Sequence, residues 1–254
     1  AWKSAEPGVL FWDTILRDSV PDCYADVGFR TVSTNPCGEI PLCPYDSCRL
    51  LAINLYSYVE KPFTKEAYFN FDKFKQHVQY GQRLMDDIVD LEMEKIDLIL
   101  DKIKKDPQSN EVKYTEYHLW EKIKKKSGEG RRTGLGITAE GDMLAALNLR
   151  YGTQNATDFS VSVHKNLALN AYRNSVLMAK EGGAFEIYYA TRESLYSFIV
   201  RLHAADSGLY EDIVIYGRWN TAWLTIDSTC KTSLKTQTTM CTLPVYTVVV
   251  KQPR

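Results

Sequence analysis

The sequence predicts an α/β fold in which long helices are separated by a few strands. Three observations predict it. Apolar residues recur at helical spacing from Phe71 to about Lys105, and again from about Thr157 to Lys180. Residues 243–250 are rich in Val, which favours a strand. Prolines and glycines, which favour turns, stand between these segments.

The beginning of the chain is expected to form short elements around a loop. Residues 1–22 indicate a short helix or turn, because Pro7-Gly8 precedes a cluster of apolar residues. Residues 30–47 are expected to be a loop, since they contain four turn-forming residues: Pro36, Gly38, Pro41 and Pro44. Residues 48–59 are rich in Leu, Ile and Tyr, which indicates a strand or another buried segment.

The remainder is expected to be helical, with strands near its end. The helices are predicted over 71–105, 115–126, 139–149, 157–180 and 192–216, and the strands over 222–226 and 243–250. Pro107 ends the first of these helices and Gly128 the second. Thr138 is predicted to cap the third, and the last is broken near Asp206-Ser207-Gly208.

Composition limits the class of protein. The 254 residues suffice for one or two domains, and 31 basic against 32 acidic residues give a net charge of −1. No basic stripe is interleaved with aromatic residues, so nucleic acid is not an expected partner. No apolar run reaches the roughly 18 residues of a membrane span. Six scattered cysteines favour a reducing, cytoplasmic setting over a disulfide-built domain, and the missing initial Met suggests a processed or excised piece.

The loop contains the most reactive set of side chains in the chain, Asn35-Pro36-Cys37-Gly38-Glu39. A thiol is easily oxidised, a carboxylate can accept a proton, and a carboxamide can donate and accept hydrogen bonds. This set suits redox chemistry on a hydroxylated substrate. The alternative is that Cys37 is a small buried apolar residue beside a proline turn.

Three ordered blocks resemble a known family. The first runs from Ala1-Trp2-Lys3-Ser4 through Pro7-Gly8 to Thr34–Glu39, Ser47-Cys48 and Ile53-Asn54-Leu55. The second is Arg131 to Ala139 with Gly141 to Leu144, and the third, which fits more loosely, is Leu224-Thr225-Ile226 with Thr232-Ser233-Leu234 and Thr236-Gln237-Thr238-Thr239. Together they resemble the large, catalytic subunit of ribonucleotide reductase, most closely the vitamin B12 (adenosylcobalamin)-dependent kind. The chain would be a central part of that subunit.

The resemblance implies a more specific fold. It implies a ten-stranded α/β barrel with the Cys37 loop, at about 33–42, inserted as a finger through its centre. Residues 1–254 would be a partial barrel domain, with a long helical stretch over about 71–182. Its barrel strands would lie at about 48–56, 222–226 and 243–250.

The resemblance also implies roles for individual residues. Cys37 would become a thiyl radical that removes the 3′-hydrogen of a ribonucleotide. Glu39 would take the 3′-hydroxyl proton, and Asn35 would hold the substrate by hydrogen bonds, with Pro36 and Gly38 beside it. Cys48 would be one member of a reducing dithiol, whose partner cysteine belongs to an earlier strand that this chain lacks.

A second substrate-binding segment is expected at the end of the strand near 222–226. The resemblance places substrate phosphates on residues 228–233: Ser228, Thr229, Cys230, Lys231, Thr232 and Ser233. The family pattern there is Ala-Pro-Thr-Gly-Thr-x-Ser, from which this chain departs. Asp227 would repel phosphate and the lost glycine removes backbone freedom, although Lys231 could offset part of the charge.

Other patterns have simpler explanations. Cys37, Cys43 and Cys48 lack the paired spacing or the adjacent histidine of zinc sites, so no metal site is expected. Gly134-x-Gly136 is interpreted as a tight turn into a helix. The four histidines, His77, His118, His164 and His203, lie in helical segments and are expected to be structural or solvated.

The implied function is reduction of ribonucleoside di- or triphosphates to 2′-deoxyribonucleotides, with adenosylcobalamin as the cofactor. A thioredoxin-like dithiol reductant is the implied protein partner, and a homodimer is the assembly allowed for. The alternative is a non-catalytic fragment of such an enzyme, since the partner cysteine and much of the barrel are missing.

Overall fold

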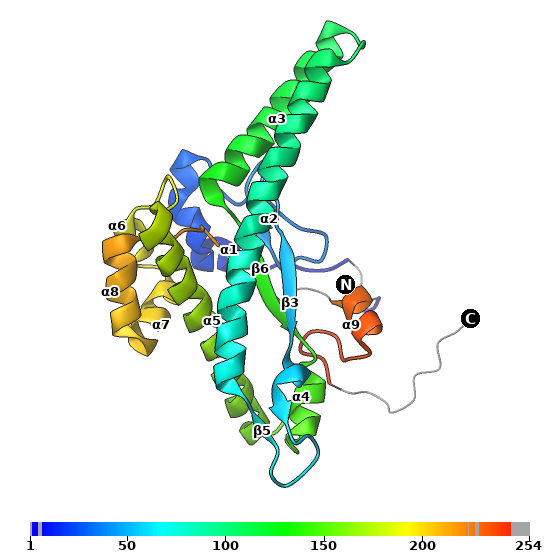
Figure 1. The fold of residues 1–254 in the computed structure, drawn as a ribbon, viewed down its shortest axis with the longest axis vertical. Helices are drawn as coiled ribbons and strands as arrows, with labels where there is room; N and C mark the ends of the chain where they lie inside the picture. The colour runs from blue at the N-terminus through cyan, green and yellow to red at the C-terminus, as the bar shows by residue number, and fades with distance from the viewer. Residues whose placement is uncertain (1, 5–6, 223, 227–228, 245–254) are drawn as a thin grey trace, which may run out of the picture. The chain divides into compact units, whose positions relative to one another are not determined.

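The computed structural model describes residues 2–4, 7–222, 224–226 and 229–244 (Figure 1). The chain divides into two compact units. The first unit comprises Ala1–Arg49, Asp86–Thr133 and Ser175–Ala222; the second comprises Leu50–Met85, Gly134–Asn174 and Trp223–Arg254. Helices α2 (Phe71–Lys105) and α5 (Gln154–Gly182) each contribute to both units. Among the described helices, none is both long and apolar enough to cross a membrane.

The first unit begins with helix α1 (Trp12–Asp18) and the 3₁₀ helix η1 (Val20–Val27). Gly28 ends η1 with φ of 92°, a conformation that glycine adopts without strain. The expected loop then forms a small hairpin from β1 (Ser33–Thr34) and β2 (Pro41–Leu42). The buried side chains of Tyr24, Phe29, Cys43 and Phe185 pack together as an aromatic cluster in the same unit.

The later part of α2 and the helix α3 (Asn110–Gly130) lie side by side as a helical hairpin (Figure 1). Pro107 lies in the connection, as predicted, and Ser109 caps α3. The predicted end of α3 at Gly128 is wrong, because the helix continues through Gly130. A Cβ at Gly130 would lie 2.7 Å from the Phe29 ring, so glycine permits the close packing of this helix end against Phe29.

Three short helices complete the first unit: α6 (Ala190–Glu193), α7 (Ser197–Ala205) and α8 (Ser207–Tyr216). The predicted break near residue 206 is confirmed. Asp206 ends α7 in an extended conformation, and its carboxylate accepts the Leu209 N–H at 3.0 Å as the cap of α8.

The second unit is built on two parallel strands, β3 (Leu50–Asn54) and β6 (Gly134–Thr138), with Leu50 paired to Gly134 and Asn54 to Thr138. Leu224 adds a single parallel bridge to Leu135. The interpretation of 134–136 as a turn was wrong, because these residues lie inside β6. All five residues of β6 are buried, so its glycines are retained by tertiary pairing despite their low strand propensity.

Other elements of the second unit are short. After β3 come the 3₁₀ helix η2 (Leu55–Tyr58) and the antiparallel pair β4 (Val59–Glu60) and β5 (Tyr68–Phe69). Each sheet formed by the described residues has two strands, and these sheets do not close into a barrel. Of the strand expected over 222–226, the described residues form a single bridge at Leu224, and the Thr225 N–H donates to the Leu135 carbonyl at 3.1 Å. Residues 245–250 of the expected last strand lie outside the described residues.

Helices α4 (Glu140–Ala146) and α9 (Cys230–Thr236) complete the second unit. The prediction that Thr138 caps the helix at 139–149 is wrong. The cap is Ala139, in a left-handed conformation with φ of 63°. The Thr138 hydroxyl instead bonds to the hydroxyls of Thr229 and Ser233, because Thr138 still belongs to the buried strand β6.

Candidate active site

The backbone of the β1–β2 hairpin presents Cys37 at its tip. Asn35-Pro36-Cys37-Gly38 has the residue order of a type I turn, with Pro in the second position and Gly in the fourth. The Gly38 N–H donates to the Asn35 carbonyl at 3.0 Å, and the Asn35 N–H donates to the Ile40 carbonyl at 3.1 Å. Gly38 has a φ of 81°, a backbone conformation that would be strained in a residue with a side chain. The turn therefore leaves the Cys37 thiol exposed.

Asn35 and Glu39 are brought together across the turn. The Asn35 carboxamide donates to one Glu39 oxygen, Oε1, at 2.5 Å and accepts the Ile40 N–H at 3.0 Å. The other oxygen, Glu39 Oε2, is buried and has no hydrogen-bond partner among the described residues. A buried carboxylate oxygen without a hydrogen-bond partner lowers the free energy of unfolding. Such oxygens are found in sites where a ligand supplies the missing donor.

Cys48 lies in a segment held by two buried arginines. Arg132 Nε binds Asp46 Oδ2 at 2.6 Å. Arg49 pairs with Glu92 and also donates to the Arg132 carbonyl at 3.0 Å and to the Ser127 hydroxyl at 2.9 Å. These contacts fix the backbone on both sides of Cys48.

The surroundings of the Cys48 thiol keep it protonated. Burial raises the pKa of this thiol to about 12. The carboxylates of Asp46 and Glu39 act in the same direction, whereas the guanidinium groups of Arg132 and Arg49 oppose it. The negative charge of Glu39, in the loop, thus contributes to the raised pKa of the Cys48 thiol.

Cys43 is a structural residue. Its side chain is buried among aromatic rings, and its thiol donates to Asp46 Oδ2 at 3.4 Å. Burial also raises its pKa to about 12. Cys43 is buried whereas Cys37 is exposed, and the described residues contain no cluster suited to a metal ion.

The segment expected to bind phosphate belongs to the second unit. Ser228 lies outside the described residues. The hydroxyls of Thr229 and Ser233 bond to each other at 2.9 Å and both bond to Thr138, and both residues are buried. Thr232 is exposed on α9, the helix that also contains Cys230 and Lys231. The two buried hydroxyls are thus engaged inside the unit.

Sequence reasoning missed several charged residues of the first unit. Three ion pairs have at least one buried side chain: Arg49–Glu92, Arg132–Asp46 and Arg218–Glu193. A signal for two of them was present, since Arg131-Arg132 belongs to one of the recognised blocks and Asp46 stands two residues before Cys48. The partners could not be paired from sequence, because they are separated by tens of residues.

Comparisons with known proteins give a consistent result. Residues 1–253 match the family described as the ribonucleotide reductase barrel domain. The chain is 30% identical over 191 residues to the vitamin B12-dependent ribonucleoside-diphosphate reductase of Thermoplasma acidophilum, covering 75% of this chain and 21% of that protein. It is 28% identical over 193 residues to the protein of the same name from Mycobacterium tuberculosis, covering 76% and 23%.

A solved structure shows the same fold. The Actinobacillus ureae class Id ribonucleotide reductase alpha subunit matches with a TM-score of 0.60 and 18% identity, over 94% of this chain and 36% of that chain. The chain thus spans about a fifth of the length of the two curated relatives.

Proposed function

Because this chain belongs to the ribonucleotide reductase barrel-domain family, we propose that it carries the active-site loop of an enzyme that reduces ribonucleotides to 2′-deoxyribonucleotides. The observation that carries the proposal is the loop itself. It exposes the Cys37 thiol two residues before the Glu39 carboxylate, which has one oxygen held by Asn35 and one buried oxygen that no described residue bonds.

In the proposed reaction, a thiyl radical at Cys37 removes the hydrogen atom from C3′ of the substrate. Glu39 accepts the proton of the 3′-hydroxyl, and the 2′-hydroxyl leaves as water with a proton supplied by the dithiol. Asn35 holds Glu39 in place and offers its amide to a substrate oxygen. The hydrogen returns from Cys37 to C3′ at the end, which restores the radical.

Cys48 is proposed to supply reducing equivalents together with a second cysteine of the enzyme. The two thiols give up two electrons and two protons and form a disulfide, so that one ribonucleotide and one dithiol yield one deoxyribonucleotide, one water and one disulfide. The raised pKa of Cys48 supports this role, because a neutral thiol retains the hydrogen that the reduction consumes. A dithiol protein would then reduce the disulfide.

The barrel with its central finger belongs to the same proposal. The parallel pairing of β3 with β6, extended by Leu224, supports a barrel wall in the second unit. The alternative of a non-catalytic remnant is not favoured, because the family match runs through residues 1–253 and includes the loop.

The names of the curated relatives suggest adenosylcobalamin, which would supply the radical that oxidises Cys37. None of the described residues marks a position for it. All four histidines lie on helices, and the segment from Val20 to Arg49, which contains the loop and Cys48, has none. We therefore assign no residue of this chain to the cofactor.

The first test is Cys37→Ser in the complete enzyme, with Cys23→Ala as the control. Cys23 packs against the aromatic cluster and has no part in the proposed chemistry. Cys37→Ser should abolish deoxyribonucleotide formation and retain nucleotide binding, whereas Cys23→Ala should keep turnover. Reduction by the Cys37→Ser enzyme would refute the assignment.

Two further variants separate the roles. Glu39→Gln should lower kcat by roughly 10²- to 10⁴-fold, the usual contribution of a general base. Cys48→Ser should allow little beyond a single turnover with a dithiol reductant. Normal multiple turnover by Cys48→Ser would remove Cys48 from the reaction.

A further inference from the structure

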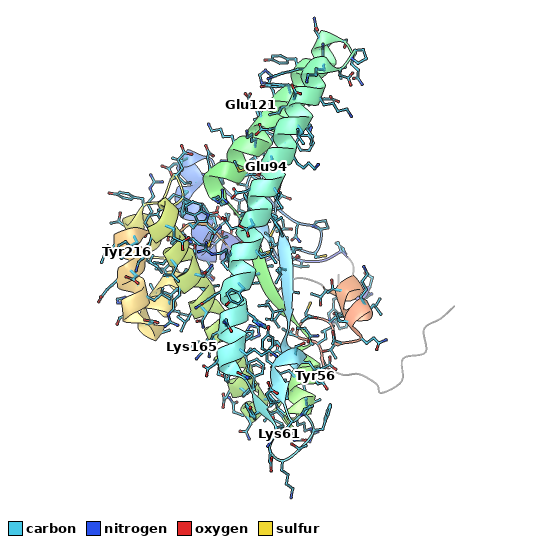
Figure 2. All side chains as sticks on the ribbon, in the orientation of Figure 1. Tyr56, Lys61, Glu94, Glu121, Lys165 and Tyr216 are labelled. Carbon is cyan, nitrogen blue, oxygen red and sulfur yellow. The ribbon has the colours of Figure 1, made fainter. Side chains whose placement is uncertain are left out.

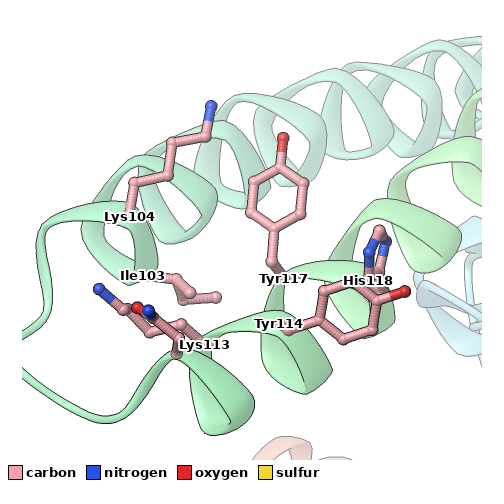
Figure 3. Close-up of a pocket in the computed structure, with 7 residues that line it drawn as sticks. Ile103, Lys104, Lys113, Tyr114, Tyr117 and His118 are labelled. Atoms are coloured by element: carbon pink, nitrogen blue, oxygen red, sulfur yellow. The ribbon is translucent and has the colours of Figure 1, made fainter.

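A pocket lies at the tip of the α2–α3 hairpin, in the first unit (Figure 3). Its volume is about 430 Å³, within the range of sites that bind small molecules. Ile103, at the end of α2, contributes a buried apolar side chain, and Lys104 follows it on the same helix. The other lining residues come from the first turns of α3.

Aromatic rings form one side of this pocket. The rings of Tyr114 and His118 meet edge to face with centroids 4.1 Å apart, and Tyr117 lies edge to face with His118 at 6.0 Å. Tyr114 is 68% exposed, although large aromatic side chains are usually buried. Rings fixed by their neighbours and open to solvent are suited to stack on a planar ligand.

Two lysines line the pocket together with the rings. Lys104 and Lys113 line the pocket, and the Lys104 ammonium lies 5.1 Å from the centre of the Tyr117 ring. None of the described residues that line the pocket is acidic, although α2 carries seven acidic residues between positions 86 and 101. Glu94 on α2 and Glu121 on α3, labelled in Figure 2, are exposed outside the lining.

One carboxylate does reach a lining residue. Glu121 Oε2 lies 3.2 Å from His118 Nδ1, on the helical turn that follows the pocket. This contact orients the imidazole ring and is not directed at the lysines. The remaining polar group is the side chain of Asn110, which can donate to or accept from a ligand.

We propose that the hairpin tip binds a small anion that carries a planar ring, such as a phosphorylated or carboxylated aromatic compound. Lys104 and Lys113 neutralise the anionic group, and Tyr114 and Tyr117 contact the ring. Lys104 exchanges its contact with Tyr117 for the anion, which is a stronger partner than an aromatic face. The site uses none of the residues assigned to ribonucleotide reduction.

Calorimetric titration of the complete protein with four simple probes tests this proposal: phenyl phosphate, benzoate, phenol and inorganic phosphate. The first two combine ring and charge, and should bind at least about tenfold more tightly than the last two, a difference of roughly 1.4 kcal/mol. Phenyl phosphate binding more tightly than benzoate identifies a phosphorylated ligand, and the reverse order a carboxylated one. If neither phenyl phosphate nor benzoate binds more tightly than phosphate and phenol, the proposal is overturned.

Variants locate the site. Lys113→Ala and Tyr114→Leu should each weaken binding of the tighter probe by about tenfold, whereas Lys102→Ala, an exposed residue of α2 outside the lining, should not. Both pocket positions are at least partly exposed, so the helical circular dichroism signal should be kept. Unchanged affinity in both pocket variants would also overturn the proposal. The titration does not depend on turnover, so it can be run on the Cys37→Ser enzyme.

Discussion

Replacing Asp86 with alanine should strongly destabilise the first unit. Asp86 lies on α2 with its side chain 6% exposed, and it accepts hydrogen bonds from three residues. Arg131 donates through Nε at 2.9 Å and Nη2 at 2.7 Å, Trp219 through its indole N–H at 2.6 Å, and Asn220 through its amide at 2.9 Å. The carboxylate thus joins α2, the end of α3 and the segment after α8.

The magnitude follows from what the alanine variant leaves behind. Removing one partner of a buried ion pair costs about 3–5 kcal/mol, because the other charge remains buried. Here Arg131 keeps a second carboxylate, Asp90, at 2.8 Å, which offsets part of the loss. Trp219 and Asn220 each lose an acceptor, at about 1–3 kcal/mol per buried donor, although such losses are not additive. We therefore expect a loss of about 3–4 kcal/mol in the free energy of unfolding.

Urea unfolding followed by tryptophan fluorescence measures this loss, because Trp219 is itself part of the cluster. With an m-value of about 2–3 kcal/mol per molar, the midpoint should fall by roughly 1–2 M. Asp87→Ala is the matched control, since Asp87 is the next residue on α2 and is exposed; it should change stability by less than about 0.5 kcal/mol. Equal midpoints for the two variants would refute the reasoning.

Three other predictions concern a close packing contact and a buried thiol. Gly182→Ala should cost about 1–3 kcal/mol, because a Cβ there would lie 2.4 Å from the Trp219 ring; Gly208→Ala, where the nearest atom is 3.7 Å away, should not destabilise in the same thermal melt. Iodoacetamide at pH 8 should modify the exposed Cys37 and spare Cys48, whose pKa of about 12 leaves roughly one thiolate in 10⁴ molecules; equal labelling by mass spectrometry would contradict this. Folding raises the pKa of Cys48 above its ordinary value of 9.0, so the unfolded chain ionises first as the pH rises. The protonated Cys48 thiol therefore contributes fully to the free energy of unfolding below pH 9, and this contribution should be lost between about pH 9 and 12.

Local patterns predicted the helices well. The ends of α2 at Phe71 and Lys105 agree with the prediction, because the apolar spacing is sustained and Pro107 forbids continuation. The break at Asp206 is equally local, since one carboxylate caps the following helix. Strand β6 was missed because glycines are typical of turns. These residues form a strand because they pair with Leu50 to Asn54, which are far away in the sequence.

In the candidate site, too, local contacts could be predicted from the sequence and long-range contacts could not. The pairing of Asn35 with Glu39 spans four residues and follows from the turn that Pro36 and Gly38 impose. The environment of Cys48 could not be predicted, because Arg132 approaches Asp46 from 86 positions away. Burial, which dominates the pKa of this thiol, is a property of the folded chain.

The parallel pairing of β3 with β6 has a consequence for how the protein is made. Leu50 pairs with Gly134, so 84 residues must leave the ribosome before β3 can find its neighbour. At about 5–20 residues per second this takes roughly 4–17 s, and Leu224 follows Leu135 by a further 89 positions. Throughout that interval β3 has an unpaired edge that another nascent chain could occupy. The intervening hairpin of α2 and α3 can form from local contacts meanwhile, so helix formation should precede strand pairing during synthesis.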